Sequence, residues 1–447
     1  MVDGSSLQLA TFAVDATPAV GDPIAYGTVD GVDDPLSCRG VVLFPTGQPI
    51  VLAAIDWIGN YNGAHKAWQS ALADAAGTSP ERVAMHAVHQ HEAPGFDPDT
   101  ETLLLGHGIE HHRVDAAFAR ETIRRAAAAV GDAITDPEPV SHVGIGSGEV
   151  TQVASNRQVL GEDGTCCYVR YTSGGQDFEF ASSAPEGVID PVLRTLSFWR
   201  EDEALAALTY YATHPQSYYR NGLVSCDFPG IARNRHQAET GVFHVHFNGA
   251  AGNVTAGKYN DGSEENRLVL AQRLMDGMAD AWENTERQPV DGGDVRWEVE
   301  RVAIPPAPNL NTAELIEGCI DNPDEPPARK LIWKRRCDLG DLIPLTCLHV
   351  NDASVIHMPG ELFVEYQLAA QRMQPDRTVM MAAYGDGGPG YMGTRAAYPL
   401  GGYEINVSKV SPKVEDVLTP PIRRFLDAED ATVTPSDITA EKPRTDR

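Results

Sequence analysis

The sequence has few of the features that mark whole classes of proteins. None of its apolar runs approaches the roughly 18 residues that a membrane-spanning helix needs. The first residues, MVDGSSLQLATFAVDATPAVG, contain neither the basic segment nor the apolar segment of a secretory signal. We therefore expect a protein without a transmembrane segment that resides in the cytoplasm.

Cysteine is scarce and shows no pairing pattern. The chain has seven cysteines in 447 residues, an odd number, and no two of them form a Cys-x-x-Cys motif. This pattern argues against a disulfide framework and against a zinc site built from cysteines. We expect the thiols to be buried or idle.

Lysine is also scarce, and the chain is strongly acidic. Only 7 of the 35 basic residues are lysines, and the net charge is −28. Because phosphate binding requires clustered Lys and Arg, this balance argues against nucleic acid as a partner. The same balance disfavours anionic membrane surfaces. It fits a surface adapted to high salt, where like-charge repulsion is screened, and equally an ordinary soluble acidic protein.

The chain shows no internal repeat, no low-complexity tract and no clean linker. Short apolar runs alternate with helical patterns, which predicts an α/β protein with mixed β-sheets flanked by helices. We expect one domain over residues 1–430 and a disordered tail over 431–447. The patterns predict a strand pair within 40–57, helices over 62–77 and 111–133, and strands over 81–91, 204–214, 242–250, 353–361 and 378–385.

Two histidines close the predicted strand 81–91, and a Pro-Gly turn follows them. His89 and His91 are two positions apart, so on a strand both side chains would point to one face. Such an arrangement suits a metal ligand with a second histidine beside it, and a chance pair on a strand edge is the alternative. The more loosely spaced histidines are expected on the surface, namely His107, His111 and His112.

Three later motifs carry further candidate residues. His214 ends a predicted strand just before a proline, a position from which a side chain can face a cleft. Glu361 follows a Pro-Gly pair and is expected in the first turn of a helix, where the helix dipole favours a carboxylate. A glycine-rich loop over 385–390 leads to Tyr391, and Tyr403 follows twelve residues later.

Taken together, these motifs resemble the catalytic domain of the neutral, non-lysosomal ceramidases. Their order and approximate spacing hold over about residues 10–410. Any one match is weak, whereas six in the same order indicate a common fold and metal site. The matching motifs are His89-x-His91 before Pro94-Gly95, Asn156-Arg157, His214 with Ser217 and Ser225-x-Asp227, the turn 248–254, Pro359-Gly360-Glu361, and Tyr391 with Tyr403-Glu404.

The resemblance implies a zinc ion held by His89, His214, Glu361 and Tyr391. Imidazole nitrogen and carboxylate oxygen are ligands that zinc accepts, and a tyrosine ligand is less usual. The ion would activate water for attack on an N-acyl amide bond, as in ceramide or a related compound. The resemblance implies that His91 is the general base of this reaction.

The resemblance also gives roles to two hydrogen-bond donors, Arg157 and Tyr403, which would bind the oxyanion of the tetrahedral intermediate. The chain departs from the family at several positions. Asn253 stands where the family has aspartate in its Gly-Asp-Val turn, and Glu92 stands where a small residue is common. We expect no counterpart of the C-terminal β-sandwich domain of the ceramidases.

Three functions remain open at this stage. Hydrolysis of a long N-acyl amide predicts a deep apolar pocket beside the zinc. The same site acting on a small polar amide, ester or lactone predicts a shallow polar pocket lined by Glu92, Asp227 or Arg395. A non-catalytic homologue that binds a metal or ligand predicts the loss of one zinc ligand or of His91.

Overall fold

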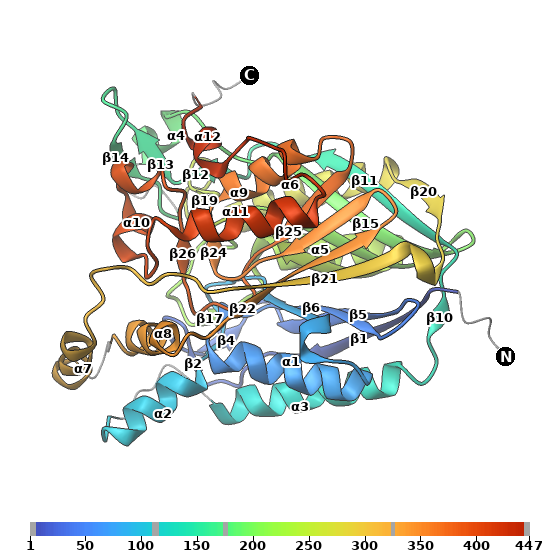
Figure 1. Cartoon of the computed structure of the whole chain (residues 1–447), viewed down its shortest axis with the longest axis horizontal. Coiled ribbons are helices and arrows are strands. Elements are labelled where there is room, and N and C mark those ends of the chain that lie inside the picture. The colour runs from blue at the N-terminus through green and yellow to red at the C-terminus, as the bar shows by residue number, and fades with distance from the viewer. Residues whose placement is uncertain (1–5, 110–115, 173–177, 323–326, 442–447) are drawn as a thin grey trace.

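The computed structural model describes residues 6–109, 116–172, 178–322 and 327–441. Three β-sheets form its centre, and helices cover their outer sides (Figure 1). The predicted fold class, α/β with mixed sheets flanked by helices, is confirmed. No helix in the described ranges is long and apolar enough to span a bilayer. All seven cysteines are free, as their spacing predicted.

The first sheet has the strand order β10-β1-β5-β6-β8. Its central strands are almost continuously apolar because both faces of the sheet are covered. Helices α1 (Gly63–Ala76) and α3 (Ala116–Ala133) pack on the outer face (Figure 1). The strands are β1 (Gln8–Asp15), β5 (Ser37–Phe44), β6 (Ile50–Ile55), β8 (Val83–Ala87) and β10 (Glu138–Pro139).

The second sheet has the order β18-β16-β15-β11-β20 and is covered by α5 (Asp227–Thr240) and α6 (Glu264–Glu283). Glycines in β11 let the backbone of α6 approach closely. A Cβ on Gly146 would lie only 1.9 Å from the carbonyl oxygen of Ala281. The strands are β11 (His142–Glu149), β15 (Val192–Arg200), β16 (Glu203–Tyr211), β18 (Phe243–Asn248) and β20 (Glu286–Pro289).

The third sheet has the order β21-β22-β23-β25, and α9 (Val364–Met373) and α11 (Val414–Phe425) lie against it. The inner faces of all three sheets share one apolar cluster. Leu52, Phe247 and Val355, one from each sheet, are fully buried in it. Removing this surface from water fixes the sheets against one another. The strands are β21 (Val295–Val302), β22 (Ile343–Val350), β23 (Ala353–His357) and β25 (Thr378–Ala382).

Shorter elements connect and cap the sheets. The helices are α2 (Pro98–Gly106), α4 (Phe178–Ser183), α7 (Thr312–Asp321), α8 (Ala328–Asp338), α10 (Tyr403–Val407) and α12 (Pro435–Thr439). The strands are β2 (Pro23–Ile24), β3 (Gly27–Thr28), β4 (Gly31–Val32), β7 (Gly59–Asn60), β9 (Gly95–Phe96), β12 (Ser155–Asn156), β13 (Gln158–Leu160), β14 (Cys166–Val169), β17 (Leu223–Val224), β19 (Val254–Thr255), β24 (Glu361–Leu362) and β26 (Tyr391–Met392).

Each sheet contains one parallel pair, and the carboxyl ends of the three pairs meet. The pairs are β6–β8, β16–β18 and β23–β25. The side-chain amide of Asn248 donates to the carbonyl of Val88 at 3.1 Å, and the N–H of Ala383 donates to the carbonyl of Asn248 at 3.0 Å. The loops that leave these strands therefore converge, and they carry the histidines of the predicted site.

The five strands predicted singly all end earlier than predicted, and two of them end before the histidines of the site. The strand predicted over 81–91 ends at Ala87, and the strand predicted over 204–214 ends at Tyr211. His89 has a φ of 84°, a left-handed conformation that a strand does not contain. His89 and His91 therefore share a loop rather than a strand face. The predicted helix 111–133 is described from Ala116, and residues 111–115 lie outside the described residues.

Glu361 does not lie in the first turn of a helix, contrary to the prediction. It belongs to β24, which pairs in parallel with β26 so that Glu361 is opposite Tyr391, and α9 begins only at Val364. The left-handed Gly360, with a φ of 61°, turns the chain into this pairing.

The tail predicted to be disordered over 431–447 is ordered in part. A capping box between Thr434 and Asp437 begins α12, and a proline occupies its first turn. Ile438 is buried, and the Ser436 hydroxyl donates to Glu415. The prediction of disorder is therefore wrong for residues 434–439. The helix cap and the burial of Ile438 order this segment although its composition is polar. Residues 442–447 lie outside the described residues.

Candidate metal centre

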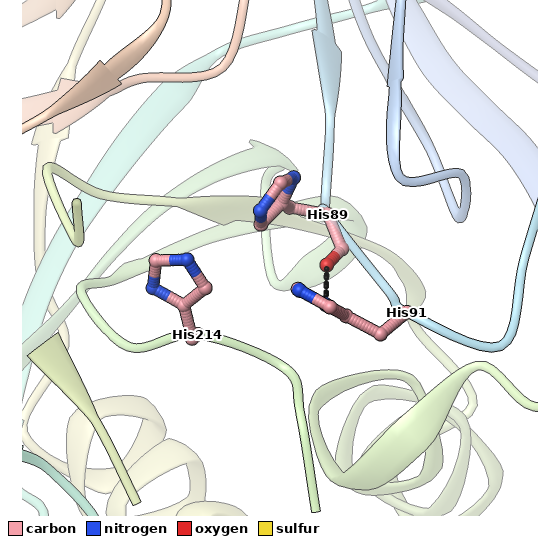
Figure 2. A group of neighbouring side chains, drawn as sticks. All are labelled: His89, His91 and His214. Carbon is pink, nitrogen blue, oxygen red and sulfur yellow. Dashed lines mark hydrogen bonds between the residues drawn. The ribbon is translucent and has the colours of Figure 1, made fainter. Parts of the chain in front are cut away.

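Three buried histidines face one another where the strand ends converge. His89 and His91 come from the loop after β8, and His214 comes from the loop after β16 (Figure 2). One ring nitrogen of each lies within 4.8 Å of the others. His107, expected on the surface, is exposed, and His111 and His112 lie outside the described residues.

The second nitrogen of each ring is held by a backbone carbonyl. Nδ1 of His89 lies 2.5 Å from the carbonyl oxygen of Ile58, and Nδ1 of His214 lies 2.7 Å from that of Ala251. Nδ1 of His91 lies 3.1 Å from the carbonyl oxygen of His89 (Figure 2). Because a carbonyl can only accept, each Nδ1 must carry the proton, which leaves Nε2 with a free lone pair. Histidines that bind metals are oriented in this way.

Glu361 brings a carboxylate to the same point. Its Oε2 lies 3.4 Å from Nε2 of His89 and 3.4 Å from Nε2 of His214. These three atoms are buried and have no hydrogen-bond partner among the described residues. Lone pairs that face one another without a proton between them fit a divalent cation.

The donor set tests which cation fits. Two imidazole nitrogens and one carboxylate oxygen form a combination that zinc accepts, with room for a fourth ligand. The same atoms suit other divalent transition metals. The residues of this chain therefore fit the zinc that the sequence predicts, and the donor chemistry alone does not choose among the metals.

Arg157 joins the other predicted residues to this cluster. Its Nη1 donates to the hydroxyl of Tyr391 at 3.3 Å, and its carbon Cζ lies 5.2 Å from the centre of the Tyr403 ring. Its Nε forms a fully buried ion pair with Oε1 of Glu404 at 2.8 Å, without the alignment of a hydrogen bond. Burial, followed by the Glu361 charge, raises the pKa of Tyr391 well above its ordinary value. The Tyr391 phenol is therefore neutral at pH 7 even beside the Arg157 guanidinium, unless a metal ion binds it.

All seven residues predicted for the site are thus brought together, from segments between 89 and 403. There are two candidate sets of metal ligands. The predicted set is His89, His214, Glu361 and Tyr391, with His91 outside it, whereas the three ring nitrogens also form a group that includes His91. His89 and His214 belong to both sets.

Several residues around the centre were missed by the sequence analysis. The Tyr384 ring stacks on His89 with ring centres 4.6 Å apart, and Tyr26 stacks on His91 at 5.7 Å. Glu404 pairs with Arg157, and its place next to Tyr403 was the available signal. Tyr219, whose ring centre lies 5.4 Å from that of His91, had no signal in the local pattern.

The three polar residues predicted to line a shallow pocket have other roles. The Glu92 carboxylate accepts from the backbone N–H of Asn221 at 2.8 Å. Asp227 accepts from the N–H of Ser217 at 3.0 Å, and Arg395 forms an exposed ion pair with Asp416. These contacts lie within the fold or on the surface, and the pocket lined by these residues stays a prediction.

Asn253, which replaces the aspartate of the ceramidases, ties two parts of the site together. Its side-chain oxygen accepts from the N–H of Val364 at 2.9 Å, at the start of α9. Its backbone carbonyl accepts from the N–H of Arg157 at 2.7 Å. The asparagine therefore makes a structural contact here.

Gly252 packs against the backbone of Glu361, and a side chain at this position would disturb the site. A Cβ at this position would lie 2.2 Å from the carbonyl oxygen of Glu361, so Gly252→Ala must displace that backbone. We expect a loss of about 1–3 kcal/mol in the free energy of unfolding and weaker metal binding. Chemical denaturation and metal titration measure both. Gly293→Ala is the control, because a Cβ there meets nothing within 4 Å, and equal behaviour of the two variants would contradict the argument.

The space beside the centre is small. A cavity of about 10 Å³ is bounded by Ile58, Tyr61, His89, Glu361 and Tyr384, enough for about one water molecule. A larger cavity of about 70 Å³ lies between Asn156, Gln158 and the segment around α12, and none of the seven predicted residues lines it.

The fold and the site together define a mixed-sheet α/β protein with a buried centre suited to a divalent metal. Neither a family model nor a curated protein sequence matches the chain. Among solved structures it is similar to neutral ceramidase from Pseudomonas aeruginosa, with a TM-score of 0.69 and 16% identity over 99% of this chain and 76% of that chain. A ceramidase complexed with C2 gives a TM-score of 0.67 and 16% identity over 95% and 75%. The predicted resemblance to neutral ceramidases is confirmed for the fold.

Proposed function

We propose that the protein is a zinc-dependent hydrolase that cleaves an N-acyl amide bond in ceramide or a related N-acyl compound, and that it acts in the cytoplasm. The observation that carries the proposal is the meeting of three buried, unpartnered atoms, Nε2 of His89, Nε2 of His214 and Oε2 of Glu361. The similarity of the fold to neutral ceramidases supports it.

In this proposal His89, His214, Glu361 and Tyr391 hold the zinc, which would supply Lewis acidity and an activated water. His91 is the general base. Burial, and then the neighbouring His89 and His214, lower the pKa of the His91 ring well below its ordinary value. The ring is therefore neutral at pH 7 and able to accept a proton and to return it to the leaving amine.

Arg157 and Tyr403 are proposed to stabilise the negative charge that develops on the substrate oxygen. The Arg157 guanidinium is buried, and the facing Tyr391 and Glu404 keep it charged. Tyr403 packs against Arg157 and is 37% exposed, so its ring borders both the buried centre and the solvent. Donors fixed before the reaction stabilise such a charge without reorganisation.

Tyr403→Phe removes one of these donors and keeps the ring. We expect kcat to fall by about 100- to 1000-fold, with unchanged metal content. Steady-state kinetics and metal analysis test this. The control is Tyr171→Phe, since Tyr171 contacts Tyr403 with ring centres 5.9 Å apart but has a half-exposed ring. A Tyr403→Phe variant with the kcat of the wild type would remove Tyr403 from the mechanism.

A second candidate is the same chemistry on a small polar amide, ester or lactone. A non-catalytic metal-binding role is the third candidate, and it is disfavoured because all seven residues named by the resemblance meet at one centre.

The test uses zinc-reconstituted protein, metal analysis and two kinds of substrate, a fluorescent ceramide and short N-acyl amides. About one zinc per chain together with release of acyl acid from either substrate supports the proposal, and the preferred substrate decides between the first two candidates. Zinc binding without any hydrolysis would favour the non-catalytic role. Failure to bind zinc or another divalent metal would overturn the proposed centre.

A further inference from the structure

Close to the proposed base lies an arginine, Arg220, that has no acidic partner among the residues that the structure describes. The Arg220 guanidinium lies 5.3 Å from the ring centre of Tyr26 and 5.4 Å from that of Tyr219. Both rings contact His91, with centres 5.7 Å and 5.4 Å away. One aromatic ring therefore separates the cation from the proposed catalytic histidine.

The loop that carries Arg220 is held in place from both sides. Glu92, directly after His91, accepts from the N–H of Asn221 at 2.8 Å. The carbonyl of Gly222 accepts from the N–H of Asp30 at 2.8 Å. Arg220 itself has a φ of 71°, a conformation that costs a residue with a side chain about 1–3 kcal/mol. Such strain persists where the surroundings fix it, and it is common at sites that hold a ligand.

Within the described residues Arg220 forms no ion pair with a carboxylate, although the chain is strongly acidic. The net charge is −28, so a guanidinium would readily find a carboxylate on this surface. Many exposed arginines do so, among them Arg200, Arg301 and Arg372. In the described part of the chain, Arg220 is exposed and contacts tyrosine faces instead. Because the rings pack on its planar face, its N–H edges stay free to donate.

We propose that Arg220 is the anion-binding subsite of this centre, and that the substrate is a compact N-acyl compound bearing a carboxylate. A guanidinium edge matches a carboxylate with two parallel hydrogen bonds. Tyr26 and Tyr219, which contact both His91 and the guanidinium, place this donor one ring away from the proposed base. The inference rests on the proposed hydrolase function and names its substrate class.

The experiment compares matched charged and neutral substrates on the zinc-loaded full chain. One pair places the charge on the amine part, N-hexanoylglycine against N-hexanoylglycinamide. The other pair places it on the acyl part, N-butylsuccinamic acid against N-butylsuccinamide. We expect wild-type kcat/KM to be roughly 10- to 100-fold higher for the charged member of at least one pair. Arg220→Gln should abolish that preference while leaving the neutral substrates within about twofold.

Arg395→Gln is the matched control, because Arg395 is an exposed arginine already paired with Asp416. It should keep the preference for the charged substrate. Equal rates on both members of both pairs, or a preference that survives in Arg220→Gln, would overturn the subsite. If the wild type cleaves the fluorescent ceramide but none of the four compounds, the hydrolase proposal stands and the compact, charged substrate class is rejected. If it cleaves neither, the hydrolase proposal fails, and calorimetric binding of the four compounds then tests the subsite. Binding of the charged members that is no tighter than that of the neutral ones would reject it.

Discussion

Replacing His89 by alanine is expected to remove the metal from the centre and to lower kcat/KM by about 1000-fold or more. His89 supplies one of the two buried nitrogens that face Glu361, and its ring is fixed by Ile58 on one side and Tyr384 on the other. Lewis-acid activation is worth several kcal/mol, and each 1.4 kcal/mol is a factor of ten in rate. Metal analysis after dialysis and kinetics on the best N-acyl substrate measure the two effects.

His107→Ala is the control for this experiment, because His107 is an exposed histidine outside the buried centre. It should retain both metal and activity. A His89→Ala variant that keeps a full complement of metal would contradict the proposed ligand set. The variant His91→Ala then separates the two candidate sets. Loss of activity with retained metal assigns His91 as the base, whereas loss of metal assigns it as a ligand.

Much of this centre could be predicted from short motifs, and the reason is physical. Each motif ends a strand or begins a tight turn, and such positions have a local signature in proline, glycine and histidine. The backbone conformation at the site was harder to predict from the sequence. The left-handed His89 and the β24–β26 pairing of Glu361 depend on partners about 30 residues away, so the expected strand face and helix turn were both wrong.

The residues that contact the predicted site residues were the hardest to predict from the sequence. Tyr219 contacts His91, and Arg220 lies behind Tyr219, because the loop after β16 is hydrogen-bonded to Glu92 and to Asp30. No periodicity encodes that contact. Glu92 shows the difference most clearly, since its charge suggested the mouth of the site, whereas its carboxylate fixes the loop that carries Arg220.

A buried ion pair beneath the His89–His91 loop is a further part that the sequence did not reveal. Asp56 follows β6 and is fully buried, and both its oxygens accept from Arg233, at 2.8 and 3.0 Å. The N–H of Ser37 and the side-chain amide of Gln90 donate to the same carboxylate. Gln90 lies between the two histidines. The Asp56 carboxylate therefore stabilises the fold through Arg233 and also holds the loop that carries His89 and His91.

Asp56→Asn keeps the shape of the side chain and leaves the Arg233 charge buried without its partner. Such a loss destabilises a protein by about 3–5 kcal/mol, whereas Asp202→Asn, in an exposed pair with Arg287, should change the free energy of unfolding by less than about 0.5 kcal/mol.

Burial raises the pKa of Asp56, but Arg233 outweighs it and the net pKa is lowered. Its contribution is therefore present above the unfolded-state pKa of about 3.9 and is lost as pH falls through the folded-state value. Denaturant titrations should show the full difference between wild type and Asp56→Asn at pH 7 and a shrinking difference in acid. A difference that is the same at every pH would mean that packing, and not the charge of Asp56, is what the variant loses.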